Sequence, residues 1–214
     1  MESTMALHAV EVRDKFTYAD YLQFPGDQRW ELIEGQPYDM SPAPGTEHQR
    51  ISGNIFGILW VWSKHMDNGR EPALKKEKCM VFAAPFDVRL PHTMAINGKD
   101  DISDSDVDTV VQPDIVVICD KNRIDNKGCI GPPDVVVEIL SPSTAYKDTT
   151  EKLSIYEKHG VREYWIVNPQ ARYIMLYSLD RGAYGTPAYL KEGDLLVSTA
   201  LSGLKLDVAS LWQE

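Results

Sequence analysis

The fold is decided by residues 133–169, which read PDVVVEILSPSTAYKDTTEKLSIYEKHGVREYWIVNP. This stretch begins with an apolar run, Val135–Leu140, the pattern of a strand that is buried on both faces. Only Glu138 interrupts the run. An ionised carboxylate in such a place costs on the order of several kcal/mol unless a cation pairs with it. The sequence therefore predicts a cation close to Glu138.

A helix follows this strand. Ser141–Thr144 ends the strand and supplies N-cap candidates, and the helix is expected to run to about His159 and stop at Gly160, a residue that favours the C-cap. Lys152 lies on an inward-leaning stripe with helical spacing, formed by Ala145, Thr149, Lys152 and Tyr156. A second strand, residues 163–167, comes directly afterwards. A carboxylate on the first strand and a lysine on the helix can therefore meet.

Composition indicates an ordinary globular protein. The chain has 214 residues, of which 43% are hydrophobic and 25% charged. This length predicts a single domain over residues 16–214, after a flexible N-terminal arm at residues 1–15. No stretch of about 18 uninterrupted apolar residues is present, so we expect no membrane association. The N-terminus also lacks the pattern of a secretory signal.

The cysteines favour a cytoplasmic location. Cys79, Cys119 and Cys129 form no closely spaced pair motif. Unpaired cysteines are typical of the reducing cytosol, where they simply pack in the interior. We therefore expect a cytoplasmic protein without disulfides.

The remaining segments predict an α/β protein. Residues 91–111 and 120–133 are polar and rich in turn residues, and we expect both to be loops. Two helices are expected, a short one at 17–22 and a long one from Thr46 to about Met66. The expected strands are a hairpin at 30–34 and 37–40, further strands at 79–83, 86–90 and 115–118, and peripheral strands at 173–179 and 189–197. This order predicts a mixed central sheet whose central strands are covered by the two longer helices.

Two acidic residues form the centre of the candidate site. Asp114 stands at the start of one apolar strand and Glu138 lies within another. Carboxylates that neighbouring strands bring together make an oxygen-rich site suited to Mg²⁺ or Mn²⁺, and the backbone carbonyl of Ile139 is a natural further ligand. Such an ion can orient a phosphodiester and help to generate hydroxide. Lys152 can then stabilise the charge on the phosphate or position the attacking water.

Each of these residues has an ordinary structural alternative. Asp114 can be a turn aspartate, Glu138 can belong to a structural ion pair, and Lys152 can be a solvated helix lysine paired with Asp148. Asp134 competes with Asp114 as the second acid. Asp134 and Glu138 share a strand, however, and four residues at about 3.3 Å each separate them by about 13 Å. One ion cannot bridge that distance, which favours Asp114.

The motifs resemble a known nuclease family. Pro113-Asp114 followed by Glu138-Ile139-Leu140 resembles the signature of PD-(D/E)XK nucleases, with leucine in the place of the lysine. A longer pattern is similar to the Uma-type putative restriction endonuclease family. It consists of ELIEG at 31–35, SPAPGTEHQRISGNI at 41–55, QPDIVVI at 112–118, VVEILSPST at 136–144, then Asp148, Lys152, Tyr156, Gly160-Val161 and EYWIV at 163–167.

The resemblance implies a fold and an activity. It implies a restriction-endonuclease-like fold, Mg²⁺-dependent hydrolysis of phosphodiester bonds in DNA, and a catalytic lysine moved to the following helix, where Lys152 stands. It also implies a further acid, bound to the metal directly or through water, that matches Glu34. A turn or solvent contact is the structural alternative for Glu34. Asn168 departs from the aspartate that the family usually has there, which affects a turn and not the chemistry.

Other polar residues have weaker claims. His48, at the start of the long helix, is a candidate contact for a substrate phosphate, although a lone histidine is usually structural. Tyr156 is expected to pack and to orient Lys152. Asp104, Asp106 and Asp108 imitate the start of a calcium-binding EF-hand loop, but the glycine and the closing glutamate of that loop are missing. We expect a solvated acidic loop there.

The net charge conflicts with binding to DNA. A charge of −10 opposes contacts to phosphate unless basic residues gather locally. The candidates are Lys75, Lys76, Lys78, Lys121, Arg123, Lys127, Lys147 and Lys152. A homodimer that forms a substrate channel is another way to concentrate positive charge, although the sequence shows no such interface.

Three functions remain open from the sequence. The first is a metal-dependent DNA endonuclease, and the second is a catalytically silent module of the same fold that binds nucleic acid or protein. The third is a metal-dependent phosphoesterase with a small substrate. The intact set of Asp114, Glu138 and Lys152 favours the endonuclease.

Overall fold

The computed structural model describes residues 15–40, 43–65, 79–92 and 102–213. Its larger sheet has seven strands in the order β12-β11-β10-β9-β6-β3, with β13 also paired to β11. These strands are β3 (Met80–Ala83), β6 (Ile115–Ile118), β9 (Val135–Ile139), β10 (Glu163–Asn168), β11 (Tyr173–Asp180), β12 (Ala183–Tyr184) and β13 (Ala188–Lys191). Strands β9 and β10 are parallel while β9 and β6 are antiparallel, so the sheet is mixed as the sequence predicts.

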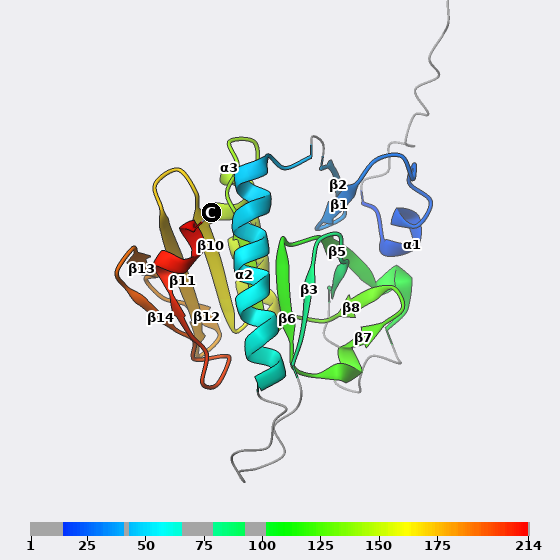
Figure 1. The fold of residues 1–214 in the computed structure, drawn as a ribbon. Coiled ribbons are helices and arrows are strands. Elements are labelled where there is room, and N and C mark those ends of the chain that lie inside the picture. The colour runs from blue at the N-terminus through cyan, green and yellow to red at the C-terminus, as the bar shows by residue number, and fades with distance from the viewer. Residues whose placement is uncertain (1–14, 41–42, 66–78, 93–101, 214) are drawn as a thin grey trace, which may run out of the picture.

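A second sheet of six strands lies beside the first (Figure 1). Its order is β2-β1-β5-β4-β8-β7. These strands are β1 (Trp30–Ile33), β2 (Gln36–Asp39), β4 (Val88–Pro91), β5 (Val107–Val111), β7 (Ile124–Asp125) and β8 (Gly128–Ile130). The smaller elements are a two-stranded sheet, β14 (Leu195–Val197) with β15 (Lys205–Asp207), and the short helices α1 (Tyr18–Tyr21), η2 (Asp104–Asp106), η3 (Lys121–Arg123) and η4 (Val208–Trp212).

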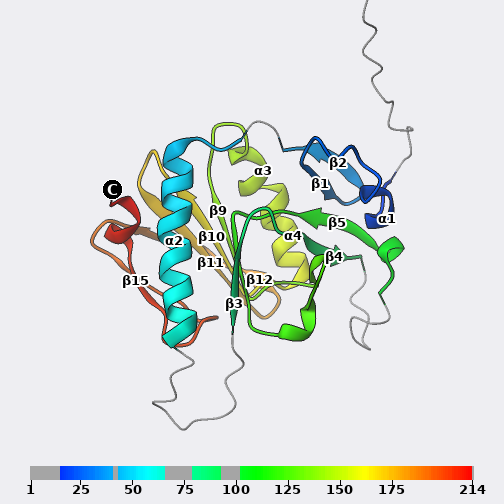
Figure 2. The same ribbon diagram turned by 45° about the vertical axis from the view of Figure 1, so that its right-hand side comes forward.

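Helices cover both faces of β9. Helix α2 (Thr46–His65) crosses one face of the larger sheet, where Ile51, Ile55 and Leu59 are fully buried (Figure 1). Helices α3 (Ala145–Thr149) and α4 (Glu151–His159) are seen in the turned view of Figure 2, and Ile155 and Tyr156 of α4 pack with the opposite face of β9. Burial of each aliphatic side chain of this kind stabilises the fold by roughly 1.5–3 kcal/mol relative to leaving it exposed to water.

The strand register brings the two predicted acids together. Strands β6 and β9 pair Ile115 with Val137. The next position along this antiparallel pair sets Asp114 beside Glu138. Side chains alternate between the faces of a strand, so Glu138 shares the α4 side with Val136. The buried carboxylate therefore points toward the helix that carries Lys152.

The predicted hairpin is confirmed, although its turn lies at residues 34–35, one residue earlier than the predicted strand bounds imply. Strands β1 and β2 pair from Trp30 with Asp39 to Ile33 with Gln36. Glu34 and Gly35 form the turn, with φ of 48° and 84°. Positive φ at both central positions is typical of the two-residue turns that suit the twist of a hairpin. The side chain of Glu34 consequently stands at the tip of the hairpin.

The helix predicted between Thr144 and His159 is broken at Thr150. Helix α3 ends at Thr149, and α4 begins at Glu151. The hydroxyl of Thr149 donates to the Ala145 carbonyl at 2.6 Å, and that of Thr150 donates to the Tyr146 carbonyl at 2.6 Å. Side-chain hydroxyls that compete for helix carbonyls in this way favour a bend. The predicted stop at Gly160 is confirmed, with φ of 84°.

Two segments predicted as loops contain strands. Within residues 91–111, the described part from 102 onward forms η2 and β5, and β5 pairs with both β1 and β4. Within residues 120–133, β7 and β8 form a hairpin. These short strands are stabilised by pairing with distant strands and not by a local periodic pattern. The acidic and turn-forming residues around them therefore suggested loops. Gly128 is required in the second hairpin: its φ is +121°, and an added Cβ would lie 2.2 Å from the Asp87 carbonyl oxygen.

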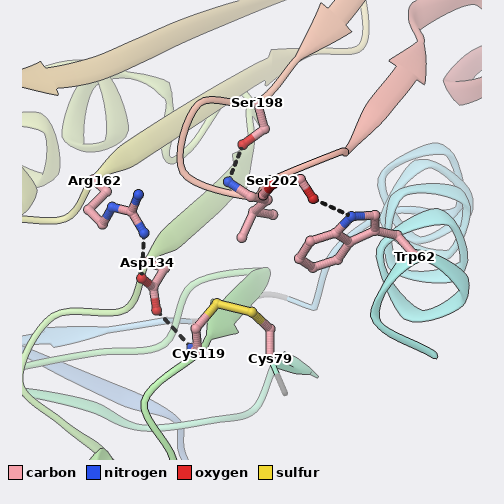
Figure 3. Close-up of a disulfide and its surroundings, with 8 residues drawn as sticks. Trp62, Cys79, Cys119, Asp134, Arg162, Ser198 and Ser202 are labelled. Carbon is pink, nitrogen blue, oxygen red and sulfur yellow. Dashed lines mark hydrogen bonds and ion pairs between the residues drawn. A yellow bond between two sulfur atoms is a disulfide. The ribbon is translucent and has the colours of Figure 1, made fainter. Parts of the chain in front are cut away.

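The prediction that the cysteines are unpaired is wrong for two of them. Cys79 and Cys119 form a disulfide, and Cys129 is a buried free thiol. Strands β3 and β6 pair Met80 with Ile118, so the two cysteines stand opposite each other at the next position. Figure 3 shows the bridge beside Asp134, whose carboxylate accepts the Cys119 N–H at 2.7 Å. Because two of the three cysteines are paired, the cysteines no longer indicate that the protein resides in a reducing compartment.

Some predictions fall outside the described residues. They are the arm at residues 1–14, Ser41-Pro42, the end of the long helix at Met66, and the basic residues Lys75, Lys76 and Lys78. Among the helices that the structure describes, none has the length and apolar character needed to span a bilayer.

Candidate active site

A cavity of about 190 Å³ lies where the two sheets and three helices meet. It contains all the predicted site residues except Glu34. Its charged and polar lining comes from β1 or the residue beside it (Arg29, Glu31), β2 (Asp39), α2 (His48), the approach to β6 (Gln112, Asp114), β9 (Glu138), the turn after β9 (Ser141, Ser143, Thr144), α3 (Lys147, Asp148) and α4 (Lys152). Ile139 lines it as well.

Asp114 and Glu138 occupy the same corner of this cavity. The Asp114 N–H points to Glu138 Oε2 at 3.4 Å, and the Ile139 N–H donates to Asp114 Oδ2 at 2.8 Å. Glu138 is 4% exposed. The two carboxylates therefore lie on adjacent strands and on the same side of the sheet, as the sequence predicts.

Lys152 joins three carboxylates. Its Nζ lies 2.8 Å from Glu138 Oε1, 2.8 Å from Glu31 Oε1 and 3.6 Å from Asp148 Oδ1. Burial alone lowers the pKa of Lys152, but the surrounding carboxylates outweigh burial and hold that pKa well above its usual range. The side chain therefore stays a cation.

The carboxylates of the cluster outnumber its cations. Burial, together with the charges of Asp148, Asp114 and Glu31, raises the pKa of Glu138 well above its usual value, against the opposing effect of Lys152. Burial likewise raises the pKa of Asp148, whose Oδ1 has no hydrogen-bond partner in the part of the chain that the structure describes. Glu31 differs, because Lys152 overcomes the effect of burial and lowers its pKa. Further positive charge would therefore stabilise the cluster.

Glu31 is the acid that the sequence analysis missed. It lies on β1, is 1% exposed, and accepts the Gln112 N–H at 3.0 Å in addition to its ion pair with Lys152. A signal was present in the sequence: Glu31 is an acid within the apolar strand that includes Leu32 and Ile33, the same feature that identified Glu138.

Glu34, in contrast, does not reach the cluster. Its carboxylate is 55% exposed and pairs with Lys158 Nζ at 2.8 Å. It lines a separate surface pocket with Lys15, Gln36 and Tyr146. The role inferred for Glu34 from the family resemblance therefore has no support in the geometry, and Glu31 is the hairpin acid that stands in the site.

His48 lies against Asp114. Its Nε2 is 3.1 Å from Asp114 Oδ2, and its side chain is 12% exposed. Burial lowers the pKa of His48, but hydrogen bonding and charge from Asp114, helped by the Ile139 backbone, give a net rise. The geometry places His48 at the predicted site, in contact with an acid.

Tyr156 fixes the orientation of Glu138. Its hydroxyl donates to Glu138 Oε1 at 3.0 Å, and burial raises its pKa far above the usual value, so it remains a donor. Oε1 of Glu138 is thus held by both Tyr156 and Lys152. Oε2 has only the 3.4 Å contact with the Asp114 N–H among the described residues, and it faces Asp114.

The donor set fits a hard divalent cation. Within the described ranges, no group of three or more His, Cys, Asp or Glu side chains is arranged so that it could hold a metal ion by itself. Mg²⁺, however, is usually bound by one or two carboxylates together with water and substrate phosphates. Asp114 and Glu138 provide two such carboxylates, and the buried Asp148 Oδ1, 3.6 Å from Lys152 Nζ, has no hydrogen-bond partner among the described residues. These residues therefore suit the ion that the sequence implies.

Comparison with solved structures supports the fold. The crystal structure of a putative nuclease belonging to DUF820 from Anabaena variabilis ATCC 29413 matches with a TM-score of 0.67 and 20% sequence identity. The match covers 92% of this chain and 97% of that chain. The predicted restriction-endonuclease-like α/β architecture agrees with this likeness to a nuclease fold.

Comparison with protein families assigns the chain. The search of curated proteins finds no match. The profile of the Uma2 family, described as putative restriction endonucleases, matches residues 18–209. This range contains both sheets and every residue of the cavity described above. The resemblance seen in the sequence motifs is thus confirmed, and the chain belongs to the Uma2 family of putative restriction endonucleases.

Proposed function

We propose that this protein is a metal-dependent endonuclease that hydrolyses phosphodiester bonds of DNA. One observation carries the proposal: Lys152 shares one cavity with five carboxylates, of which those of Glu31, Glu138 and Asp148 are buried and that of Asp114 is 17% exposed. Membership of a family described as putative restriction endonucleases supports a nuclease function.

The proposed metal ligands are Asp114 and Glu138, with the Ile139 carbonyl as a third oxygen. A bound Mg²⁺ or Mn²⁺ supplies charge stabilisation for a phosphoryl oxygen and lowers the pKa of bound water. The chain prepares the ligands itself, because the Ile139 N–H orients Asp114, and Lys152 with Tyr156 holds one oxygen of Glu138. The other oxygen of Glu138 is thereby kept on the side of Asp114.

Lys152 supplies a fixed positive charge beside these ligands. Its ammonium is preorganised by Glu31 and Glu138, so that no reorganisation is needed as negative charge develops on the phosphate. We assign Glu31 the task of positioning Lys152. For His48, which contacts Asp114, we keep the proposed role of a contact to the substrate phosphate.

The test is cleavage of supercoiled plasmid DNA by the purified protein with Mg²⁺ or Mn²⁺ and with EDTA. We expect nicked or linear product only with the divalent ion. Glu138→Gln keeps the shape of the side chain but removes its charge, and it is expected to lower the rate by at least about 100-fold, the scale of a lost electrostatic group in an active site. Glu192→Gln, on an exposed loop, is the matched control and should cleave as the wild type does.

The competing function is a catalytically silent module that binds nucleic acid or protein. It predicts no metal-dependent product and no heat of Mg²⁺ or Mn²⁺ binding by calorimetry. Wild-type cleavage that persists in folded Glu138→Gln would refute the assignment of this site. Comparing plasmid with small nucleotide phosphodiesters separates the endonuclease from a phosphoesterase of small substrates.

A further inference from the structure

Two cations lie in the more exposed part of the cavity, apart from the buried Lys152. Arg29 directly precedes β1 and Lys147 lies on α3, and both line the cavity that contains Asp114 and Glu138. Lys147 keeps 21% of its side chain exposed and Arg29 is half-buried, whereas the side chain of Lys152 is only 5% exposed. A ligand entering from solvent therefore meets these two positive charges more readily than that of Lys152.

Arg29 is oriented by a neutral partner. Its Nε and Nη2 donate to Gln112 Oε1 at 3.0 and 2.7 Å. The amide of Gln112 is itself fixed, since its Nε2 donates to Asp87 Oδ1 at 2.8 Å and to the Tyr21 hydroxyl at 3.2 Å. A guanidinium has five N–H donors, and this contact holds its plane without cancelling its charge.

Lys147 is held in place by a ring contact and by a long ion pair to a carboxylate that it shares. Its Nζ lies 4.3 Å from the centre of the Tyr38 ring and 3.7 Å from Glu31 Oε2. Glu31 already pairs at 2.8 Å with Lys152 through its other oxygen. One carboxylate is therefore shared between two lysines, and Lys147 keeps positive charge for a further anion.

Arg29 and Lys147 lie in a cavity that is otherwise strongly acidic. Its lining contains five carboxylates, those of Glu31, Asp39, Asp114, Glu138 and Asp148. The whole chain carries a formal charge of −10. A polyanion is repelled from such a surface unless fixed cations face its phosphates, and arginine with lysine is the usual phosphate-binding set. A local pair of cations resolves the conflict between net charge and substrate within a single chain.

We propose that Arg29 and Lys147 form a phosphate-binding subsite that holds a backbone phosphate of the nucleic acid next to the bond to be cleaved. The inference rests on the proposed nuclease function, because it takes the cavity to be the substrate site. The two residues position the substrate and take no part in bond making. Loss of either one weakens binding of the strand and leaves the metal ligands intact.

The experiment measures binding of a short fluorescein-labelled DNA duplex, and of its single strand, by fluorescence anisotropy. Ca²⁺ replaces Mg²⁺, and a denaturing gel verifies that the probe remains uncut. Arg29→Gln and Lys147→Gln are each expected to weaken binding several-fold. For the double variant, the plot of log binding constant against log salt concentration should be less steep. The magnitude of its negative slope should fall by at least about 0.9, the value for one lost phosphate contact on duplex DNA.

Two controls separate the subsite from bulk charge and from folding. The double variant Arg181→Gln/Lys205→Gln removes the same charge from exposed positions outside the cavity lining, and it should bind as the wild type does. Arg29→Lys keeps the charge but not the planar fork, and it should restore the salt slope with only part of the affinity. Thermal unfolding of each variant shows that it is folded.

The outcomes are distinct. The subsite is overturned if the folded double variant binds within twofold of the wild type with the same salt slope, if the control loses as much affinity, or if the wild type binds neither probe. If binding depends on Arg29 and Lys147 but no divalent ion supports cleavage, the subsite stands and the proposed nuclease activity fails.

Discussion

The ammonium of Lys152 and the carboxylate of Glu31 form an ion pair of 2.8 Å in which neither side chain is more than 5% exposed. The same ammonium contacts Glu138 at 2.8 Å and Asp148 at 3.6 Å. Through these contacts, Lys152 of α4 links β1 of the smaller sheet, β9 of the larger sheet and helix α3.

Removing this charge should destabilise the protein. Lys152→Met keeps the length of the side chain but leaves buried carboxylates without their cation, and breaking a buried pair in this way costs about 3–5 kcal/mol. Urea unfolding followed by circular dichroism measures the loss. Lys205→Met, at an exposed position on β15, should change the free energy of unfolding by less than about 0.5 kcal/mol. Equal stability of the two variants would contradict the described cluster.

Glu34→Gln should have little effect on cleavage. Its carboxylate is exposed and pairs only with Lys158 among the described residues, so we expect plasmid cleavage within twofold of the wild-type rate. Loss of a surface pair changes stability by less than about 1 kcal/mol. Glu31→Gln, which removes the buried hairpin acid, should instead lower the rate strongly. The reverse pattern of rates would return the catalytic role to Glu34.

Two histidines should give opposite dependences of stability on pH. Burial, helped by Lys158, lowers the pKa of His159 below 6.5, so its contribution is present above pH 6.5 and is lost as the pH falls through the folded-state pKa. His48 has a raised pKa, so its contribution is present below pH 6.5 and is lost as the pH rises through the folded-state pKa.

Urea unfolding across this range tests both signs. His159→Gln should flatten the fall in the free energy of unfolding on the acid side of pH 6.5. His48→Gln should flatten the fall on the alkaline side. An unchanged pH profile in either variant would show that the corresponding histidine titrates alike in the folded and unfolded chains.

The Cys79–Cys119 bridge should contribute to stability. It closes a loop with a sequence separation of 40 residues, for which a disulfide typically contributes about 2–4 kcal/mol by restricting the unfolded chain. Cys79→Ser/Cys119→Ser is therefore expected to unfold at lower urea than the oxidised wild type. A reductant should lower the wild type to the level of this variant and leave the variant itself unchanged. A reductant effect on the variant would point to another cause.

The centre of the fold could be predicted because its local signals agree. The apolar run around Glu138, the stop at Gly160 and the hairpin turn at Gly35 each have one simple structural solution. The meeting of Asp114, Glu138 and Lys152 followed from one further step, since a buried acid needs a partner and the next helix offers a lysine.

The rest depended on contacts between distant segments. Strand β5 takes its hydrogen bonds from β1 and β4, and nothing in the sequence near Val107 identifies these partners. The disulfide requires the register of β3 on β6, which a sequence without known pairing does not give. Glu31 was passed over because the acid implied by the family resemblance was matched to Glu34 in the turn, whereas the side chain of Glu31, three residues earlier on the strand, is the buried one.

Because the helix is interrupted at Thr150, the ammonium groups of two lysines can approach the carboxylate of Glu31. At about 100° per residue, side chains five positions apart on a continuous helix point about 140° away from each other. Lys147 and Lys152 have this spacing, yet both approach Glu31, from α3 and α4 respectively. The two threonine hydroxyls thereby do more than end a helix. They let one short segment of chain present a buried and a solvent-accessible ammonium to the same anion, so straightening the bend would separate the inner charge from the outer one.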